Sequence, residues 1–212
     1  VYKTLRAAVN HLGHDFSLDT VLRVGAGKEK FQAIRDLLTT VYAEEAEHLK
    51  KSKAAYQYFL DHLRKAYREM DVTPYAGTRE VFDDLRKREV GIVLNTGYNR
   101  RITGQLVDKL GWREGRDFDL LVTADDVTRG RPAPDMILLA MEQMGIDDAR
   151  RVAKVGDSTI DIEEGKAAGC GLTLGVTTGA HTAAQLQSAE PDFVIDSLSE
   201  IVEQPSLRAY FS

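Results

Sequence analysis

The second part of the chain alternates short apolar segments with longer amphipathic ones, and this alternation limits the fold more than any other feature of the 212 residues. Segments rich in Val, Ile and Leu predict strands at 91–95, 118–122, 151–155 and 172–176. Segments with helical spacing stand between and around them, at 80–87, 100–110, 136–144 and 160–168. Strands that alternate with helices predict an α/β fold with a doubly wound parallel sheet. Such sheets bind ligands at the carboxyl ends of their strands.

Residues 1–70 differ, because they contain no proline and their apolar residues recur at helical spacings. The pattern predicts helices over 2–12, 18–25, 27–38 and 42–70, with Ser17 as the N-cap of the second. Tyr56, Phe59 and Leu63 share one face of the last helix, which is typical of a buried core stripe rather than of a ligand-binding surface. Pro74 then stops helix propagation, so we expect a helical domain at 1–70 and an α/β domain at 71–212.

The composition excludes several classes of protein. A single cysteine, Cys170, cannot form an internal disulfide, and no Cys/His cluster has the spacing of a zinc site. A net charge of -5 disfavours a nucleic-acid binder. No apolar run approaches the roughly 18 residues of a membrane-spanning helix, and the first residues show no signal-peptide pattern. We therefore expect a cytoplasmic protein that binds neither nucleic acid nor membrane.

Residues capable of chemistry follow three of the predicted strands. After the first, Thr96 and Gly97 precede a helix, where a hydroxyl and exposed backbone amides make an anion site. The alternative is that Thr96 is an ordinary N-cap. After the second strand, Pro132 and Pro134 stiffen the loop that carries Arg131. A guanidinium held in this way suits the paired oxygens of a phosphate.

After the third strand, Asp157 and Asp161 stand one helical turn apart, so we expect both carboxylates to face the same space. Oxygen ligands of this kind suit Mg²⁺, which keeps several waters and needs few protein ligands. The alternative is that the two aspartates cap the helix. Paired acidic residues at a strand end of an α/β sheet favour the metal.

Three segments occur in this order after successive strands: Asn95-Thr96-Gly97-Tyr98, 122–127 leading into 130–134, and 154–157. With these segments the chain resembles the haloacid dehalogenase superfamily, whose second to fourth motifs have this form. It is most similar to the phosphonatase-like branch, because Arg131 stands where most of the superfamily has lysine. The resemblance implies a Rossmann-like catalytic core at 71–212 and a helical cap at 1–70. It also implies Mg²⁺-dependent hydrolysis of a small phosphorylated metabolite through an aspartyl-phosphate.

The resemblance further implies a role for each residue. Thr96, Gly97 and Tyr98 would bind the phosphoryl group, and Arg131 would stabilise its charge and position the nucleophile. Asp157 would ligate Mg²⁺, and Asp161 would support it. Such preorganised charge stabilisation is the main source of catalysis in phosphoryl transfer.

The first motif of the superfamily, whose leading aspartate is the covalent nucleophile, has no counterpart in the sequence. Asp19 does not replace it, because it lies in a helical pattern that Ser17 caps. We expect the first strand and the nucleophile in roughly twenty further residues upstream of residue 1. Without them the chain would be inactive, and the rival hypothesis is a non-catalytic relative that binds a phosphorylated ligand.

Lys28 is a candidate for a second chemistry. In phosphonoacetaldehyde hydrolases, which the chain resembles, a lysine after a Met-Gly segment forms a Schiff base with the substrate aldehyde and makes C–P cleavage possible. The segment 24–28 is similar, although Val24 replaces the methionine and Phe31 replaces a histidine. The alternative is a solvated lysine or a contact to the substrate phosphate. The sequence leaves the oligomeric state open, with a homodimer as one option.

Overall fold

The computed structural model describes residues 1–211 and divides the chain into two compact units, Val1–Asp71 and Val72–Ser212. We call them the helical unit and the α/β unit, and each is described by itself. The expected roles of the two parts, cap and catalytic core, stay predictions.

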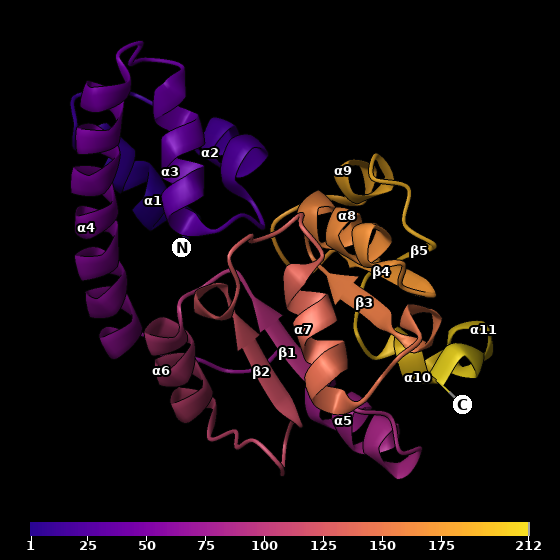
Figure 1. The fold of residues 1–212 in the computed structure, drawn as a ribbon. Helices are drawn as coiled ribbons and strands as arrows, with labels where there is room; N and C mark the ends of the chain where they lie inside the picture. Colours follow the sequence, from indigo (N-terminus) through magenta and orange to yellow (C-terminus); the bar gives the residue numbers. More distant parts are fainter. Residues whose placement is uncertain (212) are drawn as a thin grey trace. The chain divides into compact units, whose positions relative to one another are not determined.

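The helical unit consists of antiparallel and crossing helices drawn from indigo to purple in Figure 1. Its elements are α1 (Tyr2–Asn10), α2 (Leu18–Gly25), α3 (Lys30–Thr39) and α4 (Glu45–Glu69). Helix α4 packs against α1 and α3, and α2 packs against both α1 and α3. Ser17 caps α2 as predicted, since its side chain accepts a hydrogen bond from the Thr20 amide. Phe59 and Leu63 are buried, so the predicted core stripe of α4 is confirmed.

The α/β unit alternates helices with parallel strands, as the sequence predicted. Its helices are α5 (Thr78–Lys87), α6 (Arg100–Leu110), α7 (Asp135–Met144), α8 (Thr159–Ala168), α9 (Ala183–Gln187), α10 (Glu200–Glu203) and α11 (Pro205–Arg208). Short 3₁₀ helices occupy η1 (Ala124–Asp126), η2 (Ala149–Arg151) and η3 (Ala209–Phe211). The strands are β1 (Val93–Thr96), β2 (Leu120–Thr123), β3 (Ala153–Gly156), β4 (Leu172–Val176) and β5 (Phe193–Ile195).

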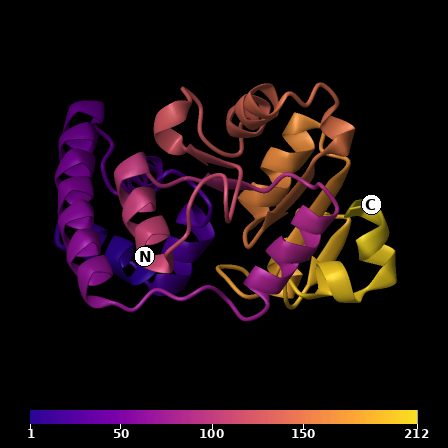
Figure 2. The ribbon, with the colours of Figure 1, turned by 90° about the horizontal axis from the view of Figure 1, so that it is seen from below.

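The strands form two parallel sheets in the described residues. Strand β1 pairs with β2, and β4 lies between β3 and β5. Helix α7 packs on β1 and β2, whereas α8 packs on β3 and β4 (Figure 1). Figure 2 shows α5 beside the C-terminal helices, and α5 contacts α10.

One apolar cluster joins the two sheets into a single core. Its buried side chains come from α5, β2 and β4, among them Val81, Leu121 and Leu174. A smaller cluster of Val122, Met136 and Ala140 lies between β2 and α7. Because both sheets share the larger cluster, the ends of β1 and β3 belong to the same folded unit.

Several element boundaries differ from the prediction. The first three strands begin two residues later than predicted, and the segment 149–151 before β3 is a 3₁₀ helix. The first helix ends at Asn10 rather than near Gly13, which adopts a positive φ of 92° after the helix has ended. Strand β5 and the helices after β4 were not predicted, because segments of three to five residues show too little periodicity.

Candidate active site

Thr96 is the last residue of β1, and its hydroxyl serves the turn that follows. The Tyr98 amide donates a hydrogen bond to Thr96 Oγ1 at 3.2 Å. The N-cap of α6 is Asn99 instead, whose Oδ1 accepts a hydrogen bond from the Ile102 amide at 2.9 Å. The alternative that Thr96 is the N-cap is therefore wrong. The Thr96 hydroxyl accepts from Tyr98 and still has its own proton to donate.

The segment after β2 is anchored before it reaches Arg131. Asp126 accepts hydrogen bonds from the amide and hydroxyl of Thr123, both at 2.8 Å, and pairs with Arg100 at 2.6 Å. Burial opposes ionisation of Asp126, but Arg100 and Thr123 together hold the pKa of that carboxyl below its usual range. The chain thus enters the Arg131 loop from a fixed turn.

Arg131 itself is mostly enclosed, with 10% of its side chain exposed, and it forms an ion pair with Asp161. Its peptide bond to Pro132 is cis. Arg129 lies two residues earlier and pairs with Asp135 at 2.8 Å, but 71% of its side chain is exposed. The loop therefore turns one arginine into the unit and leaves the other at the surface.

Asp161 lies in the first turn of α8 with both carboxylate oxygens engaged. Oδ1 contacts Arg131 and, at 3.2 Å, Lys154 Nζ, and Oδ2 accepts a hydrogen bond from the Ser158 hydroxyl at 2.6 Å. Burial opposes the charged form of Asp161, yet Arg131 and Lys154 outweigh it and hold the pKa of Asp161 well below its usual range. Asp161 is a permanently charged partner for Arg131.

Asp157 directly follows β3 and has a different environment. Its Oδ2 accepts a hydrogen bond from the Ala180 amide at 2.9 Å. Burial, and then the negative charge of Asp161, raise the pKa of Asp157 above its usual range. Among the described residues, neither aspartate accepts a hydrogen bond from an amide of α8, whose N-cap is Ser158. The alternative that the two aspartates cap the helix is wrong.

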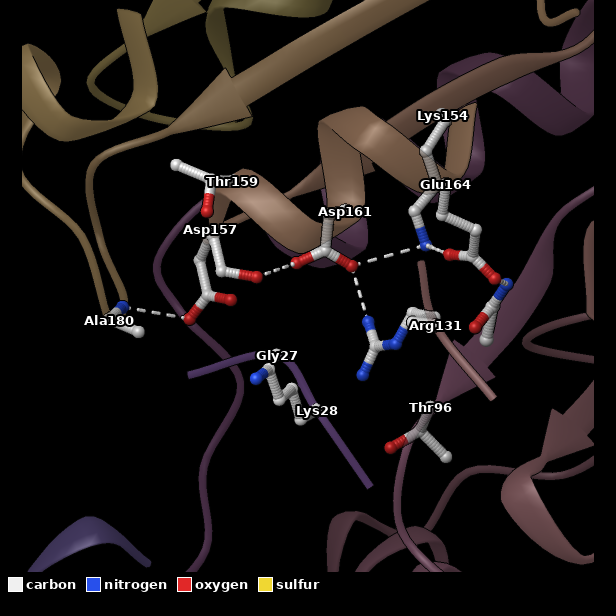
Figure 3. A network of polar contacts seen from close by, with 12 residues as sticks. Gly27, Lys28, Thr96, Arg131, Lys154, Asp157, Thr159, Asp161, Glu164 and Ala180 are labelled. Atoms are coloured by element: carbon white, nitrogen blue, oxygen red, sulfur yellow. Dashed lines mark hydrogen bonds and ion pairs between the residues drawn. The ribbon is translucent and has the colours of Figure 1, made fainter. Parts of the chain in front are cut away.

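Sequence reasoning missed three members of the same network, shown in Figure 3. Lys154 lies in β3 with 7% of its side chain exposed, and its Nζ pairs at 2.7 Å with the fully buried Glu164 of α8. Asn95 Nδ2 donates a hydrogen bond to Glu164 Oε1 at 3.1 Å. The signal in the sequence was a lysine inside a strand and two acids, Asp161 and Glu164, spaced i and i+3 on one helix.

The network balances its charges. Two cations, Arg131 and Lys154, meet two anions, Asp161 and Glu164, so the buried cluster is formally neutral. Buried charges are tolerated only when they are paired. In Figure 3 Arg131 and Lys154 converge on Asp161, and Thr96 lies on the Arg131 side of the network.

Lys28 belongs to the helical unit, in the loop between α2 and α3. Its Nζ pairs with Asp36 Oδ2 at 2.5 Å, and 27% and 29% of the two side chains are exposed. The Gly27 amide donates to the hydroxyl of Tyr2 at 3.3 Å, and Lys30 Nζ donates to the carbonyl of Lys28 at 2.5 Å. These contacts fix the loop within the helical unit.

Residues 1–211 contain no group of three or more His, Cys, Asp or Glu side chains that could hold a metal ion by themselves. No helix in this range is long and apolar enough to cross a membrane.

The fold and the three strand-end segments together define a class of protein. The sequence profile of the haloacid dehalogenase-like hydrolase family matches residues 2–169, and the chain belongs to this family. Particular relatives are similar over parts of the chain. The probable phosphatase IndB of Dickeya dadantii (strain 3937) is 47% identical over 85 residues, which are 40% of this chain and 36% of that protein.

A longer match extends to a phosphonoacetaldehyde hydrolase of Hahella chejuensis (strain KCTC 2396). It is 33% identical over 195 residues, covering 87% of this chain and 64% of that protein. The chain thus spans less than two thirds of the length of both relatives. Among solved structures, a phosphonoacetaldehyde hydrolase-like protein from Oleispira antarctica superposes with a TM-score of 0.79 at 22% identity. This match covers 99% of this chain and 85% of that one, and it supports the predicted fold.

Proposed function

We propose that the protein is a Mg²⁺-dependent phosphohydrolase of the phosphonatase-like branch and acts on a small phosphorylated metabolite. The observation that carries the proposal is the buried pairing of Arg131 with Asp161 beside Asp157, at the end of β3. A guanidinium held inside the protein next to an acidic residue without a cation of its own is a preorganised site for a phosphate and a metal.

The residues of the α/β unit divide the work in this proposal. The Thr96 hydroxyl donates to a phosphoryl oxygen. The backbone of the turn at Gly97 and Tyr98 contacts the same phosphoryl group. Arg131 places positive charge where negative charge builds up on the transferring phosphoryl group. Asp161 keeps Arg131 in place, because it stays charged over the physiological range of pH.

The donor set around Asp157 fits a hard divalent cation. Arg131 and Lys154 pair with Asp161 and not with Asp157, so burial leaves the Asp157 carboxylate with a raised pKa and an unbalanced charge. A metal ion would supply the balancing charge. Mg²⁺ needs only one or two carboxylates because it keeps several waters. Asp157 would hold the ion with Asp161 behind it, and the ion when bound would neutralise charge on the phosphoryl oxygens.

The nucleophile is proposed to be an aspartate upstream of residue 1 in the whole protein. Two facts support this: the relatives are longer than the chain, and β1 and β3 are edge strands of separate sheets in the described residues. The carboxylate oxygen would attack phosphorus while the bond to the leaving oxygen breaks and that oxygen takes up a proton. Water would then hydrolyse the acyl phosphate, releasing phosphate and restoring the carboxylate.

Hydrolysis of p-nitrophenyl phosphate by the full-length protein tests the proposal. We expect turnover with Mg²⁺, none with EDTA, and a loss of roughly 10²-fold or more in Asp157→Ala and Arg131→Ala. Arg129→Ala is the matched control from the same loop, and it should keep wild-type turnover. If the wild type binds phosphate but turns over no phosphate ester or phosphonate, the protein is instead a non-catalytic ligand-binding relative.

A second candidate function is phosphonoacetaldehyde hydrolysis, which the Hahella relative's name suggests. Here the Lys28 amine would condense with the aldehyde and release water, and the resulting iminium would accept the electron pair of the breaking C–P bond while the phosphoryl group passes to the carboxylate nucleophile. Water would then hydrolyse the acyl phosphate to phosphate, and protonation and hydrolysis of the enamine would release the aldehyde product and restore the amine. In the structure the Lys28 amine is paired with Asp36, and this contact would have to break before the amine attacks the aldehyde. Borohydride reduction in the presence of phosphonoacetaldehyde decides between the functions. A covalent adduct on Lys28, absent in Lys28→Ala, supports C–P cleavage, and no adduct excludes imine chemistry.

A further inference from the structure

The turn that follows β4 closes on Asp157 with two successive backbone amides. The Ala180 amide donates to Asp157 Oδ2 at 2.9 Å, and the His181 amide donates to the Asp157 carbonyl at 3.1 Å. The first contact fixes the carboxylate, and the second fixes the backbone that carries it. Residues 179–181, here called the clamp turn, therefore hold both parts of the residue that the proposed function assigns to the metal.

Gly179 is required in the clamp turn by space and not by backbone conformation. It is not among the glycines with positive φ. A Cβ added at Gly179 would overlap the Cβ, Cγ and Oδ2 atoms of Asp157. The absence of a side chain at this position thus lets the turn approach the carboxylate closely enough for the Ala180 amide to reach it.

His181 extends the clamp to the start of α8. Its Nδ1 accepts a hydrogen bond from the Thr159 amide at 3.1 Å, and Thr159 is the first residue of that helix. An accepting Nδ1 in a neutral imidazole places the proton on Nε2. His181 is 7% exposed, and its Nε2 has no hydrogen-bond partner among the described residues. The ring is therefore positioned by its contact with the helix.

We propose that Gly179 and His181 are positioning residues, which set the Asp157 carboxylate and the N-terminus of α8 for phosphate chemistry. The inference rests on the proposed function, because it takes Asp157 as the metal-binding carboxylate. Groups that orient a metal ligand without touching the metal typically change metal affinity or activity roughly 10- to 100-fold when they are replaced.

Gly179→Ala in the full-length protein tests the first half of the proposal. Its matched control is Gly104→Ala, since Gly104 lies in α6 and an added Cβ there meets nothing within 4 Å. Mn²⁺ replaces Mg²⁺ as a paramagnetic probe, and its binding is measured without substrate. We expect Gly179→Ala to weaken Mn²⁺ binding roughly 10- to 100-fold and Gly104→Ala to leave it unchanged. Equal binding by Gly179→Ala and the wild type would overturn the role of Gly179.

A comparison of His181→Asn with His181→Leu tests the second half even if Gly179→Ala does not fold. Asparagine keeps an acceptor for the Thr159 amide and leucine removes it. We expect hydrogen exchange at Thr159 to be slow in the wild type and His181→Asn, and faster in His181→Leu. The ¹⁵N spectrum of the wild-type ring should show the proton on Nε2. A proton on Nδ1, or equal exchange in both variants, would contradict the assignment.

The two proposals can fail separately. Absence of phosphate turnover or of Mn²⁺ binding in the wild type would end the proposed function. Hydrogen exchange and the histidine tautomer report on the contact between His181 and α8 without metal or substrate, so a failure of that contact is distinguishable from a failure of the proposed function.

Discussion

The helical unit and the α/β unit bury different kinds of side chain. In the helical unit the interior is largely apolar, and the Lys28–Asp36 ion pair keeps more than a quarter of each side chain exposed. In the α/β unit Lys154, Asp161 and Glu164 form ion pairs with at most 7% of each side chain exposed. Burying charge costs free energy of desolvation even when each charge is paired. The α/β unit accepts this cost at the strand ends where the proposed chemistry takes place.

The largest expected effect comes from removing one charge of the buried network. Lys154→Met leaves Asp161 with one cation fewer and Glu164 without its ion pair, and we expect the free energy of unfolding to fall by about 3–5 kcal/mol. Lys166→Met is the control, because 44% of the Lys166 side chain is exposed and its contact with Glu190 is 3.8 Å long. The control should lose less than about 1 kcal/mol in urea unfolding. Equal losses in the two variants would mean that burial adds nothing to the energy of the ion pairs in the network.

The helical unit should respond most strongly to loss of packing. Leu63 of α4 is 1% exposed, so Leu63→Ala leaves a cavity and should lower the free energy of unfolding by about 2–5 kcal/mol. Leu49 of the same helix is 36% exposed, and Leu49→Ala should change the free energy of unfolding by no more than about 0.5 kcal/mol. Urea unfolding of both variants measures the contrast, and a small effect of Leu63→Ala would contradict a packed core in this unit.

A smaller effect, dependent on pH, is expected at Asp126. Its folded pKa lies below the ordinary value of 3.8, so its charge adds stability above that pH and loses this contribution as the pH falls through the lower folded value. Asp126→Asn should therefore cost about 1 kcal/mol at neutral pH and progressively less below pH 3.8. Exposed Asp108 supplies the control Asp108→Asn. A deficit at Asp126 that does not change with pH would show that the carboxylate charge is not its source.

The smallest effect is expected at the surface pair of the helical unit. A double-mutant cycle with Lys28→Met and Asp36→Asn should give a coupling energy below about 1 kcal/mol, because both side chains are partly solvated. The same cycle with Lys154→Met and Glu164→Gln should give a clearly larger value. Similar coupling energies at the two sites would mean that burial does not distinguish them.

The sequence was sufficient for the fold. Periodicity identified four strands, and local pattern and resemblance singled out Thr96, Arg131, Asp157 and Asp161, whose roles stay predictions. The ion pair of Arg131 with Asp161 was not predicted, because residues thirty positions apart meet only through the packing of a loop on a helix.

Other members of the site gave weak signals or none. Lys154 and Glu164 resemble ordinary charged residues until their burial is known. The sequence assigns no role to His181, because its contact with Thr159 depends on how the turn after β4 folds back. Local patterns report secondary structure, whereas these contacts arise from tertiary structure.

The hydrogen bond between Asn95 and Glu164 has a mechanical consequence. Strands β1 and β3 share no backbone ladder in the described residues, so no regular hydrogen-bond spacing fixes the separation of their ends. The hydrogen bond from Asn95 to Glu164 and the ion pair of Arg131 with Asp161 connect the ends of the first sheet to α8, which packs on β3. We expect a substitution at Asn95 to alter the separation of these strand ends while leaving Arg131, Asp157 and Asp161 unchanged.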